Sequence, residues 1–311
     1  MKGKLVLTLP SFALSIAIIA RLVSKYLRWK QEVLQRLQAS SSIMDTTSGP
    51  IEYSVKGTGP AILLAHGSPG GYDQSLATAN MFKSDQFTYI AVSRPGYLRT
   101  PLQQKSPAAQ ADLYAALLDK LGIQKATIIG TSGGGPSALQ FALRHPERCN
   151  GLIMVCGVSQ RYSEQEMLAA LPPIRRFIAL LSERFVSSKN PTLFLIEEAL
   201  HYFPYPLIPD GLIQSLPMRE LRKIGYINDM EQFGRISSYP LEQITAPTLV
   251  LHGDQDRDVS IKDAELVANK VPHATFVIDK GGTHLFFFLH HKRLVPLILD
   301  FLVRLPSEAM G

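Results

Sequence analysis

The sequence is poor in cysteine: Cys149 and Cys156 are the only two in 311 residues. Two thiols cannot form the disulfide framework that stabilises many small secreted domains, and they are compatible with a reducing compartment. The chain also lacks the CxxC and HExxH patterns, which excludes these zinc-binding signatures. Its content of 46% hydrophobic residues is enough for one large domain of roughly 250–270 residues with an appendage.

The body of the chain lacks an excess of charge of either sign. Of the 32 basic and 26 acidic residues, seven basic and one acidic lie in residues 1–44, so this segment carries the whole net charge of +6. The rest of the chain is balanced, with 25 residues of each sign. A neutral domain gives no electrostatic argument for binding nucleic acid, and we expect no such partner.

A run of sixteen residues without a charge extends from Leu5 to Ala20. Continuing it to Val23 gives the length of about 20 residues that a bilayer-spanning helix needs, and we interpret it as an uncleaved membrane anchor. Two alternatives stay open, a cleaved signal peptide and an amphipathic helix in the membrane interface. Because the heavier basic flank follows the run, the positive-inside rule predicts a cytoplasmic catalytic domain; signal cleavage would instead predict secretion.

We expect three parts in the chain. Residues 1–44 form the membrane anchor and a basic helix, and the polar composition of residues 39–50 indicates a linker. Residues 45–157 and 241–311 form the core domain. Between them, residues 158–240 are rich in proline and aromatic residues, and we expect short helices and loops that act as a lid over a pocket.

Short apolar segments alternate with helical patterns through the core domain. Residues 108–121 have apolar side chains at helical spacing, while the continuous apolar run 61–65 is typical of a strand covered on both faces. This alternation predicts an α/β fold with a mainly parallel central sheet flanked by helices. The predicted strands are 51–55, 61–65, 89–92, 126–129, 152–155, 248–251 and 274–278.

The motif Gly130-Thr131-Ser132-Gly133-Gly134 lies between a predicted strand and a predicted helix. This order is what a nucleophile elbow requires, because its serine sits on a sharp turn with little room around it. Glycine at 130 and 134 allows the neighbouring strand and helix to approach without a Cβ clash. The turn also points the N–H of Gly133 at an oxyanion beside Ser132, so Ser132 is the predicted nucleophile.

A serine hydroxyl needs a base, and the base needs a carboxylate that orients it. His284 follows the last predicted strand, at the sheet edge where Ser132 is expected, and is the predicted base. Asp256 follows the preceding predicted strand and is the predicted acid, with Asp254 and Asp258 as open alternatives. The chain order of serine, aspartate and histidine is typical of nucleophile-elbow hydrolases.

An acyl-transfer site needs a second oxyanion donor besides the one in the elbow. The loop of residues 66–71, His-Gly-Ser-Pro-Gly-Gly, follows a predicted strand. Pro69 has no N–H, so the N–H of Ser68 is the better candidate. We expect His66 and Gly67 to shape this loop, with His66 bracing it and not acting as the base.

Three further motifs give the sequence a resemblance to the α/β-hydrolase superfamily, over roughly residues 50–305. The loop 66–71 is similar to the His-Gly-x-Pro-Gly oxyanion loop of its proline iminopeptidase-like and esterase-like branch. Residues 93–97, Ser-Arg-Pro-Gly-Tyr, resemble the Asp-x-x-Gly-x-Gly stretch, with serine in place of the aspartate. Residues 253–256 match the Gly-x-x-Asp acid loop, and the resemblance carries the acid role to Asp256.

Ser132 argues against haloalkane dehalogenase and epoxide hydrolase chemistry, for which members of the superfamily use an aspartate at that position. We therefore expect a serine hydrolase that cleaves an ester or similar acyl substrate, a small molecule that can be lipid-like, through an acyl-enzyme. Such a triad requires neither a metal ion nor an organic cofactor. The oligomeric state stays open.

Two other functions stay open on the same fold. One is an aminopeptidase or amidase of the proline iminopeptidase type, and the other is a weakly catalytic ligand receptor. An aminopeptidase would need an acidic site in the lid for the substrate amine. The lid offers Glu164, Glu166, Glu197, Glu198, Asp229 and Glu231.

Overall fold

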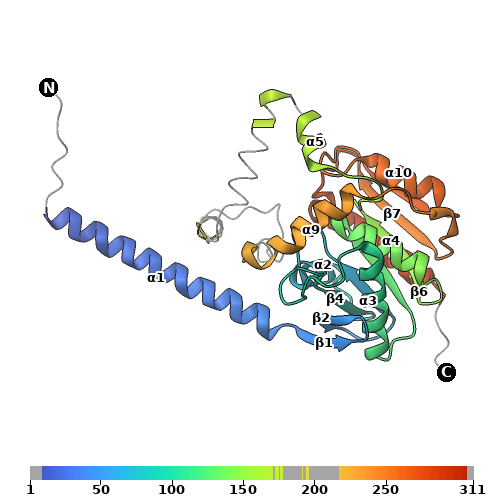
Figure 1. Ribbon diagram of the computed structural model, residues 1–311, viewed down its shortest axis with the longest axis horizontal. Helices are drawn as coiled ribbons and strands as arrows, with labels where there is room; N and C mark the ends of the chain where they lie inside the picture. The colour runs from blue at the N-terminus through green and yellow to red at the C-terminus, as the bar shows by residue number, and fades with distance from the viewer. Residues whose placement is uncertain are drawn as a thin grey trace.

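The computed structural model describes residues 9–170 and 217–306, together with residues 172–174, 176–177, 191 and 194–195 (Figure 1). Eight strands in this part of the chain form one sheet, in the order β1-β2-β4-β3-β5-β6-β7-β8. From β4 to β8 the strands are parallel, whereas β1 and β2 join antiparallel at one edge. The predicted mainly parallel sheet is confirmed. The strand bounds are β1 Ser42–Thr46, β2 Gly49–Lys56, β3 Ala61–Ala65, β4 Thr88–Val92, β5 Ala126–Thr131, β6 Cys149–Val155, β7 Thr248–Gly253 and β8 Thr275–Asp279.

Helices flank the sheet (Figure 1). The α-helices are α1 Leu9–Ala39, α2 Tyr72–Phe82, α3 Pro107–Lys120, α4 Gly135–Arg144, α5 Glu164–Ala170, α9 Lys223–Gly234, α10 Ile261–Lys270, α11 Phe286–Leu289 and α12 His291–Arg304. Three short 3-10 helices are η1 Ser132–Gly134, η2 Arg219–Leu221 and η3 Leu241–Gln243.

Two hydrophobic cores lie on the two faces of the sheet, because successive strand side chains point in opposite directions. On one face, Leu63 and Ile128 belong to a core shared with α3, α4 and α10. On the other face, Ile62 and Ile129 belong to a core shared with α2, α12 and the C-terminal half of α1. The continuous apolar runs of the central strands follow from this double burial.

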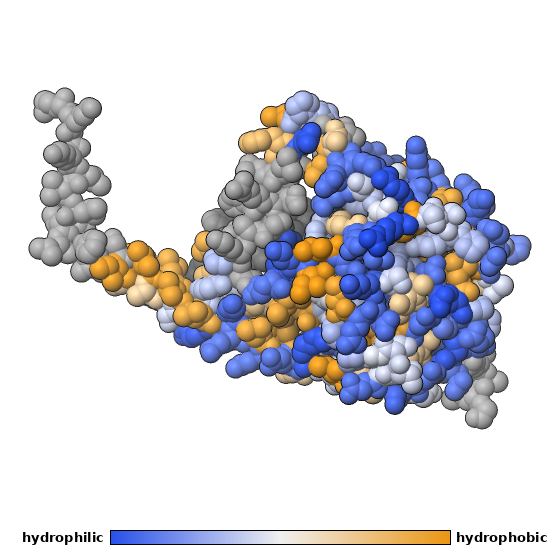
Figure 2. Space-filling view, viewed as in Figure 1, coloured by the Kyte–Doolittle hydropathy of each residue, from blue (hydrophilic) through white to orange (hydrophobic). Residues whose placement is uncertain are grey.

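The helix α1 has two different halves. Its C-terminal half belongs to the domain core through Trp29, Val33 and Leu37, which are all buried. Its N-terminal half extends away from the body of the protein, and hydrophobic side chains gather on it (Figure 2). The exposed large hydrophobic residues described in α1 are Ile16, Ile18, Ile19, Leu22 and Val23 on this half, and Leu27 just past the middle of the helix.

No helix within the described ranges combines the length and the apolar character that a membrane crossing requires. The transmembrane anchor predicted over residues 5–23 is therefore not supported. Residues 5–8 lie outside the described part of the chain. The remainder belongs to α1, a continuous helix in which the charged residues Arg21 and Lys25 end the apolar run. After these residues, one side of the helix packs on the domain core.

The linker predicted over residues 39–50 is instead the end of α1 followed by a β-hairpin. Strands β1 and β2 pair antiparallel, with Thr46 opposite Gly49 at the turn. Strand β1 is an edge strand whose side chains are exposed or half-buried, so it needs few apolar residues and its composition resembles that of a linker. The domain boundary predicted at residue 45 falls inside this strand.

The predicted lid, residues 158–240, is described in part, and its best-described element is α9. This helix lies against the loop after β4, where the N–H of Gly225 donates to the carbonyl oxygen of Gly96 at 2.9 Å. A Cβ on Gly225 would lie 2.3 Å from the ring of Tyr97, and one on Gly96 would lie 2.7 Å from the Cα of Gly225. Both positions therefore require glycine for this close approach.

Candidate active site

Ser132 lies at the turn from β5 into η1 and α4. Its φ of +49° falls in the left-handed region, which a residue with a Cβ rarely adopts and which is expected for a nucleophile elbow. A Cβ on Gly130 would lie 2.6 Å from the Cβ of Ala138, and one on Gly134 would lie 2.2 Å from the carbonyl oxygen of Ala65. The two glycines thus allow α4 and β3 to pack against the turn.

The structure brings Ser132, His284 and Asp256 together at one edge of the sheet. The Oγ of Ser132 lies 3.0 Å from Nε2 of His284, and Nδ1 of His284 lies 2.8 Å from Oδ2 of Asp256. Because Nδ1 faces a carboxylate, it carries the hydrogen and leaves Nε2 to accept from the serine hydroxyl. The side chain of Asp256 is fully buried, whereas that of His284 is 20% exposed.

Opposing effects set the charges of the acid and the base. Burial raises the pKa of Asp256, but hydrogen bonds from His252, His284 and the N–H of Val259 hold this pKa well below its usual value. Burial lowers the pKa of His284, but the neighbouring Cys156 sulfur and the Asp256 carboxylate raise it well above its ordinary value. Asp256 is therefore an anion at neutral pH, and His284 binds a proton more strongly than a free imidazole does.

The two neighbouring carboxylates that the sequence left as alternatives have other partners. Asp254 accepts a hydrogen bond from the N–H of Gly281 at 2.7 Å. Asp258 is exposed, and its backbone N–H donates to Oδ1 of Asp256 at 2.9 Å. The contact with His284 is made by Asp256.

The loop of residues 66–71 is shaped by His66 and Arg94. Nε2 of His66 accepts from the N–H of Arg94 at 2.9 Å, its Nδ1 donates to the carbonyl oxygen of Gly67 at 2.7 Å, and Nε of Arg94 donates to the carbonyl oxygen of His66 at 2.9 Å. Burial and the Arg94 charge lower the pKa of His66 well below its ordinary value, so the ring is neutral. These contacts hold the loop in shape, and they occupy both ring nitrogens of His66.

The two residues predicted to donate to an oxyanion are neighbours in space. Ser68 and Gly133 both line the cavity at Ser132. The side chain of Ser68 lies so close to Gly133 that a Cβ at position 133 would collide with it. Glycine at this position therefore lets the loop approach the elbow.

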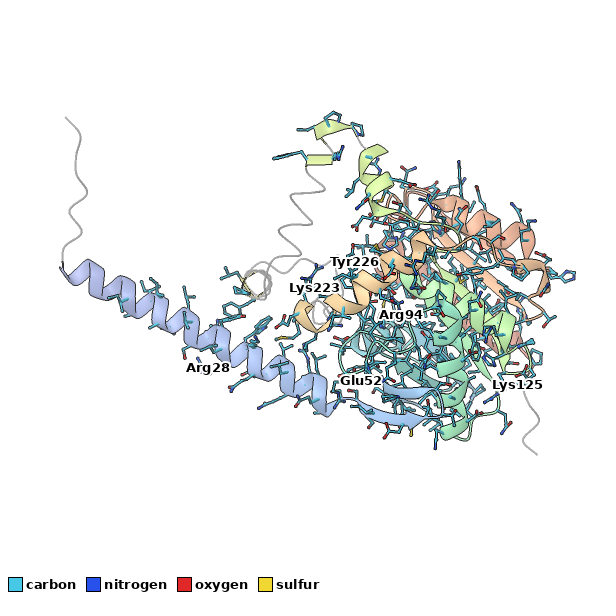
Figure 3. All side chains as sticks on the ribbon, in the orientation of Figure 1. Arg28, Glu52, Arg94, Lys125, Lys223 and Tyr226 are labelled. Carbon is cyan, nitrogen blue, oxygen red and sulfur yellow. The ribbon has the colours of Figure 1, made fainter. Side chains whose placement is uncertain are left out.

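An ion pair beneath this loop was missed by the sequence reasoning. Nη1 and Nη2 of Arg94 donate to the two carboxylate oxygens of Asp229 on α9 at 2.8 and 2.5 Å. Tyr97 Oη donates to the same carboxylate at 2.5 Å, and Ser68 Oγ donates to it while accepting from Arg94 at 2.9 Å. Arg94, labelled in Figure 3, and Asp229 are each 1% exposed. The partners stand 135 positions apart, so no local pattern could have joined them.

A cavity of ≈ 1010 Å³ opens in front of Ser132 and His284. Helix α9 contributes Lys223 and Tyr226 to its wall (Figure 3), and Tyr26 places α1 beside it. The lining is mainly apolar, which suits the hydrophobic part of a substrate. Its apolar residues include Val158, Met167, Ile227, Met230, Phe233 and Val259.

Among the acidic lid residues that the structure describes, Glu164 and Glu220 line the cavity. The carboxylate of Glu164 accepts from Tyr226 Oη at 2.8 Å, and that of Glu220 pairs with Lys30 at 3.5 Å. Glu197 and Glu198 lie outside the described residues. The acids that form ion pairs with arginine are Glu166, Asp229 and Glu231.

Known proteins resemble this chain over most of its length. The sequence profile of the alpha/beta hydrolase fold matches residues 60–291. A solved structure, an alpha/beta hydrolase fold protein from Nakamurella multipartita, is 34% identical with a TM-score of 0.64, covering 83% of this chain and 98% of that one. A 2-hydroxy-6-oxononadienedioate/2-hydroxy-6-oxononatrienedioate hydrolase from a Pseudomonas species is 25% identical, covering 85% of this chain and 97% of the relative.

A thermophilic esterase from Thermogutta terrifontis has the same fold, with a TM-score of 0.64 at 24% identity, covering 85% of this chain and 98% of that one. The proline iminopeptidase-like branch predicted from the sequence is not shown by these likenesses. The profile match spans more than half of the chain and contains the elbow, the acid loop and the histidine. The chain therefore belongs to the α/β hydrolase fold family and is a hydrolase.

Proposed function

We propose that the protein is a serine hydrolase that cleaves an ester or a similar acyl substrate through a triad of Ser132, His284 and Asp256. The observation that carries this proposal is the unbroken line of hydrogen bonds from the Ser132 hydroxyl through His284 to Asp256. The line ends at a cavity that is large enough for a small-molecule substrate.

In the first half of the reaction, Oγ of Ser132 attacks the substrate carbonyl carbon while Nε2 of His284 takes the hydroxyl proton. The anionic Asp256 stabilises the imidazolium, and the N–H groups of Ser68 and Gly133 donate to the tetrahedral oxyanion. The imidazolium then gives its proton to the leaving oxygen as the C–O bond breaks. An acyl group remains on Ser132.

In the second half, water enters where the alcohol left. His284 takes a proton from this water as its oxygen attacks the acyl carbon, and the same two N–H groups hold the second oxyanion. The imidazolium returns the proton to Oγ of Ser132, and the carboxylic acid leaves. Both halves need a neutral His284 at the start, so turnover depends on the pKa of this residue.

Two other functions have a specific observation in their favour. For an aminopeptidase or amidase, the carboxylate of Glu164 in the cavity wall is a candidate partner for a substrate amine. For a hydrolase of 2-hydroxy-6-oxo dienedioates, the function in the relative's name, Arg219 and Lys223 in the cavity wall supply the positive charge that carboxylates require. The mainly apolar lining favours the ester proposal over both.

Labelling of the full-length protein with a fluorophosphonate tests the nucleophile, because the probe reacts with an activated serine. We expect one label on Ser132, and none on the Ser132→Ala variant. Initial rates on p-nitrophenyl esters of increasing chain length, on amino-acid anilides and on a 2-hydroxy-6-oxo dienedioate then rank the substrates. A folded protein that neither labels nor turns over any of them would be a receptor, and a higher kcat/KM on anilide or dienedioate would replace the ester proposal.

We further propose that residues 158–240 cap the cavity and that the N-terminal segment attaches the protein to a membrane. The exposed apolar half of α1, with Arg21 and Lys25 beside it, suits an interfacial helix. Fractionation of cells with N-terminal sequencing tests the attachment. Release by carbonate or high salt is expected for an interfacial helix, retention for an anchor, and a shortened soluble protein for a cleaved signal peptide.

A further inference from the structure

Four neighbouring strands each deliver one reactive side chain to the same edge of the sheet. In the order β5, β6, β7, β8, these are Ser132, Cys156, Asp256 and His284, each located after the end of its strand. The proposed mechanism uses the first, third and fourth. Cys156 takes no part in its bond-making steps, although it occupies the position between Ser132 and Asp256 in the sheet order.

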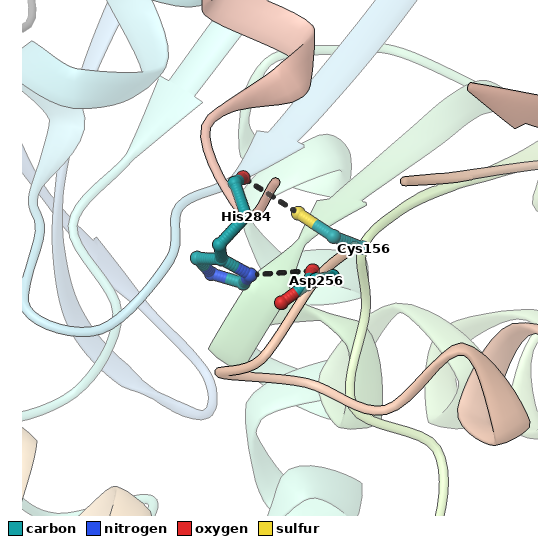
Figure 4. A group of neighbouring side chains, drawn as sticks. All are labelled: Cys156, Asp256 and His284. Atoms are coloured by element: carbon teal, nitrogen blue, oxygen red, sulfur yellow. Dashed lines mark hydrogen bonds and ion pairs between the residues drawn. The ribbon is translucent and has the colours of Figure 1, made fainter. Parts of the chain in front are cut away.

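Cys156 is held against the base of the triad. It is 2% exposed, and its φ of +41° lies in the left-handed region, where a residue with a Cβ is strained. Its Sγ lies 3.7 Å from the carbonyl oxygen of His284 (Figure 4). The thiol is therefore a buried neighbour of the group whose protonation controls turnover.

The three side chains in Figure 4 form a set of metal donors. Sγ of Cys156, a carboxylate oxygen of Asp256 and a ring nitrogen of His284 all lie within 4.8 Å of one another. Zinc binds thiolate sulfur at about 2.3 Å and imidazole nitrogen or carboxylate oxygen at about 2.0–2.2 Å, so ligands on one tetrahedral ion stand roughly 3.2–3.8 Å apart. The most widely spaced donors would have to approach by about 1 Å to surround one zinc ion. Nδ1 of His284 and Oδ2 of Asp256, which are 2.8 Å apart, would instead have to separate by about 0.5 Å.

We propose that Cys156, Asp256 and His284 form an inhibitory site for a thiophilic divalent cation such as Zn²⁺. Thiolate, imidazole and carboxylate are the donors that Zn²⁺ takes in proteins, and three protein ligands leave the fourth position for water. His284 lines the cavity, whereas Cys156 and the carboxylate of Asp256 are buried behind its ring, so entry of the ion from the cavity requires a movement of that ring. The inhibition rests on the proposed function, whereas the binding does not.

A cation at this site stops turnover by changing the tautomer of His284. Nδ1 is the ring nitrogen that faces Asp256. An imidazole that binds a metal through Nδ1 carries its hydrogen on Nε2, and this nitrogen can no longer accept the proton of Ser132. When His284 is neutral, the ring proton moves from Nδ1 to Nε2 and the thiol proton leaves to solvent, so one proton is released for each ion bound. When His284 is an imidazolium, its Nδ1 proton also leaves and two protons are released.

Cadmium chloride is the probe for binding, because a cadmium–thiolate bond absorbs in the ultraviolet. We expect the full-length protein to gain this absorption with one equivalent of Cd²⁺, and the Cys156→Ser variant to lose it. Cys149→Ser is the matched control, since Cys149 is the other buried cysteine and lies at the opposite end of β6. Ser132→Ala should gain the absorption fully, because binding does not need the nucleophile.

Zinc chloride is the probe for inhibition, with EDTA to reverse it. Loss of the Cys156 sulfur also changes the pKa of His284, so inhibition is measured against each variant's own rate without zinc. On that scale the half-inhibitory Zn²⁺ concentration of Cys156→Ser should rise at least about 10-fold, as for metal sites whose ligand shell is disturbed. Cys156→Ala carries the same expectation, and circular dichroism checks that both variants fold. Equal absorption or equal inhibition in the Cys156 variants and the unmodified protein would overturn the site. Cd²⁺ binding by a protein with no hydrolase activity would contradict the proposed function alone.

Discussion

Two buried carboxylates, one in the loop after β7 and one on α9, have different partners. Asp256 belongs to the core domain, and its carboxylate meets the imidazole of His284 together with backbone N–H groups of its own loop. Asp229 belongs to α9, and its carboxylate meets the guanidinium of Arg94 together with the hydroxyls of Ser68 and Tyr97. Both side chains are at most 2% exposed.

The difference lies in what each partner can do. An imidazole gains and loses a proton near neutral pH, so in the proposed mechanism the charge of Asp256 acts on a group that titrates during turnover. A guanidinium keeps its proton at every working pH, so Arg94 pairs permanently with Asp229 and holds α9 against the loop of residues 66–71. We therefore expect Asp256 to act on chemistry and Asp229 to act on position.

The largest effect is expected at Ser132, which is linked to Asp256 through His284. Ser132→Ala removes one oxygen from the cavity floor and should leave the fold intact. Turnover of the best ester should fall by about 10⁴–10⁶-fold, the loss found when a triad member is deleted. Single-turnover assays measure this fall, and a variant that kept most of its activity would remove Ser132 from the mechanism.

Asp256→Asn tests the first carboxylate directly. The amide cannot hold the same tautomer of His284 or stabilise its imidazolium, so kcat should fall by about 10⁴-fold. The matched controls are Asp254→Asn and Asp258→Asn in the same loop, which we expect to change kcat only slightly. A loss at residue 254 equal to that at residue 256 would transfer the acid role to the neighbour.

Asp229→Asn tests the second carboxylate. It leaves the buried guanidinium of Arg94 without its charge partner, which costs about 3–5 kcal/mol of the free energy of unfolding. Because Ser68 loses its anchor, kcat should fall by up to about 10²-fold with little change in KM, as for a misplaced catalytic group. Denaturant unfolding and steady-state kinetics measure the two effects.

A matched control separates position from stability. Asp73 pairs with Arg222 across the same interface, at 2.7 Å, but its carboxylate is not the one that Ser68 contacts. Asp73→Asn should therefore lower the free energy of unfolding while kcat stays close to that of the unmodified protein. Equal losses of kcat in Asp73→Asn and Asp229→Asn would reduce Asp229 to a purely structural role.

The pH dependence sharpens the contrast further. Since the pKa of His284 is raised above its ordinary value of 6.5, the neutral base is present only above that raised pKa. Activity should therefore fall as the pH falls through it, with an acid limb of kcat/KM above pH 6.5. Measured in EDTA, the limb of Asp256→Asn should lie lower, whereas that of Asp229→Asn should not move. An unshifted limb in Asp256→Asn would contradict the coupling.

The smallest effect on turnover is expected from shortening α1, which borders the cavity through Tyr26. Deleting residues 1–23 should change neither folding nor the hydrolysis of a short ester. Deleting residues 1–40 also removes three buried side chains, Trp29, Val33 and Leu37, each worth about 1.5–3 kcal/mol of burial. Thermal unfolding compares the two proteins, and equal melting temperatures would mean that α1 contributes nothing to the core.

Local patterns predicted seven of the eight strands, β2 to β8, and placed the three proposed triad residues in loops that follow strands. Buried parallel strands appear as continuous apolar runs, and Ser132, Asp256 and His284 come after the ends of β5, β7 and β8. The edge of a parallel sheet then brings them together without further information. The choice of Asp256 over Asp254 depended on loop geometry, and the hydrogen bonds of the structure separate the two residues.

The missed features depend on contacts between distant segments. Strand β1 has the composition of a linker because an edge strand needs little burial. The first half of α1 suggested a membrane span, but the apolar residues that pack on the core, such as Trp29, lie beyond Arg21. The sequence around Asp229 is that of a solvated helix acid, and its buried partner Arg94 lies on a distant segment. Cys156 had no partner within its own stretch of sequence.

The backbone contact between Gly225 and Gly96 has a mechanical consequence. At this contact the main chain of α9 packs directly on the main chain of the loop after β4, with no side chain between them and one hydrogen bond of 2.9 Å joining them. A single methyl group at Gly225 would collide with the ring of Tyr97 and push α9 away from the loop. Because α9 also forms a wall of the cavity, this displacement would widen the space in which the substrate lies.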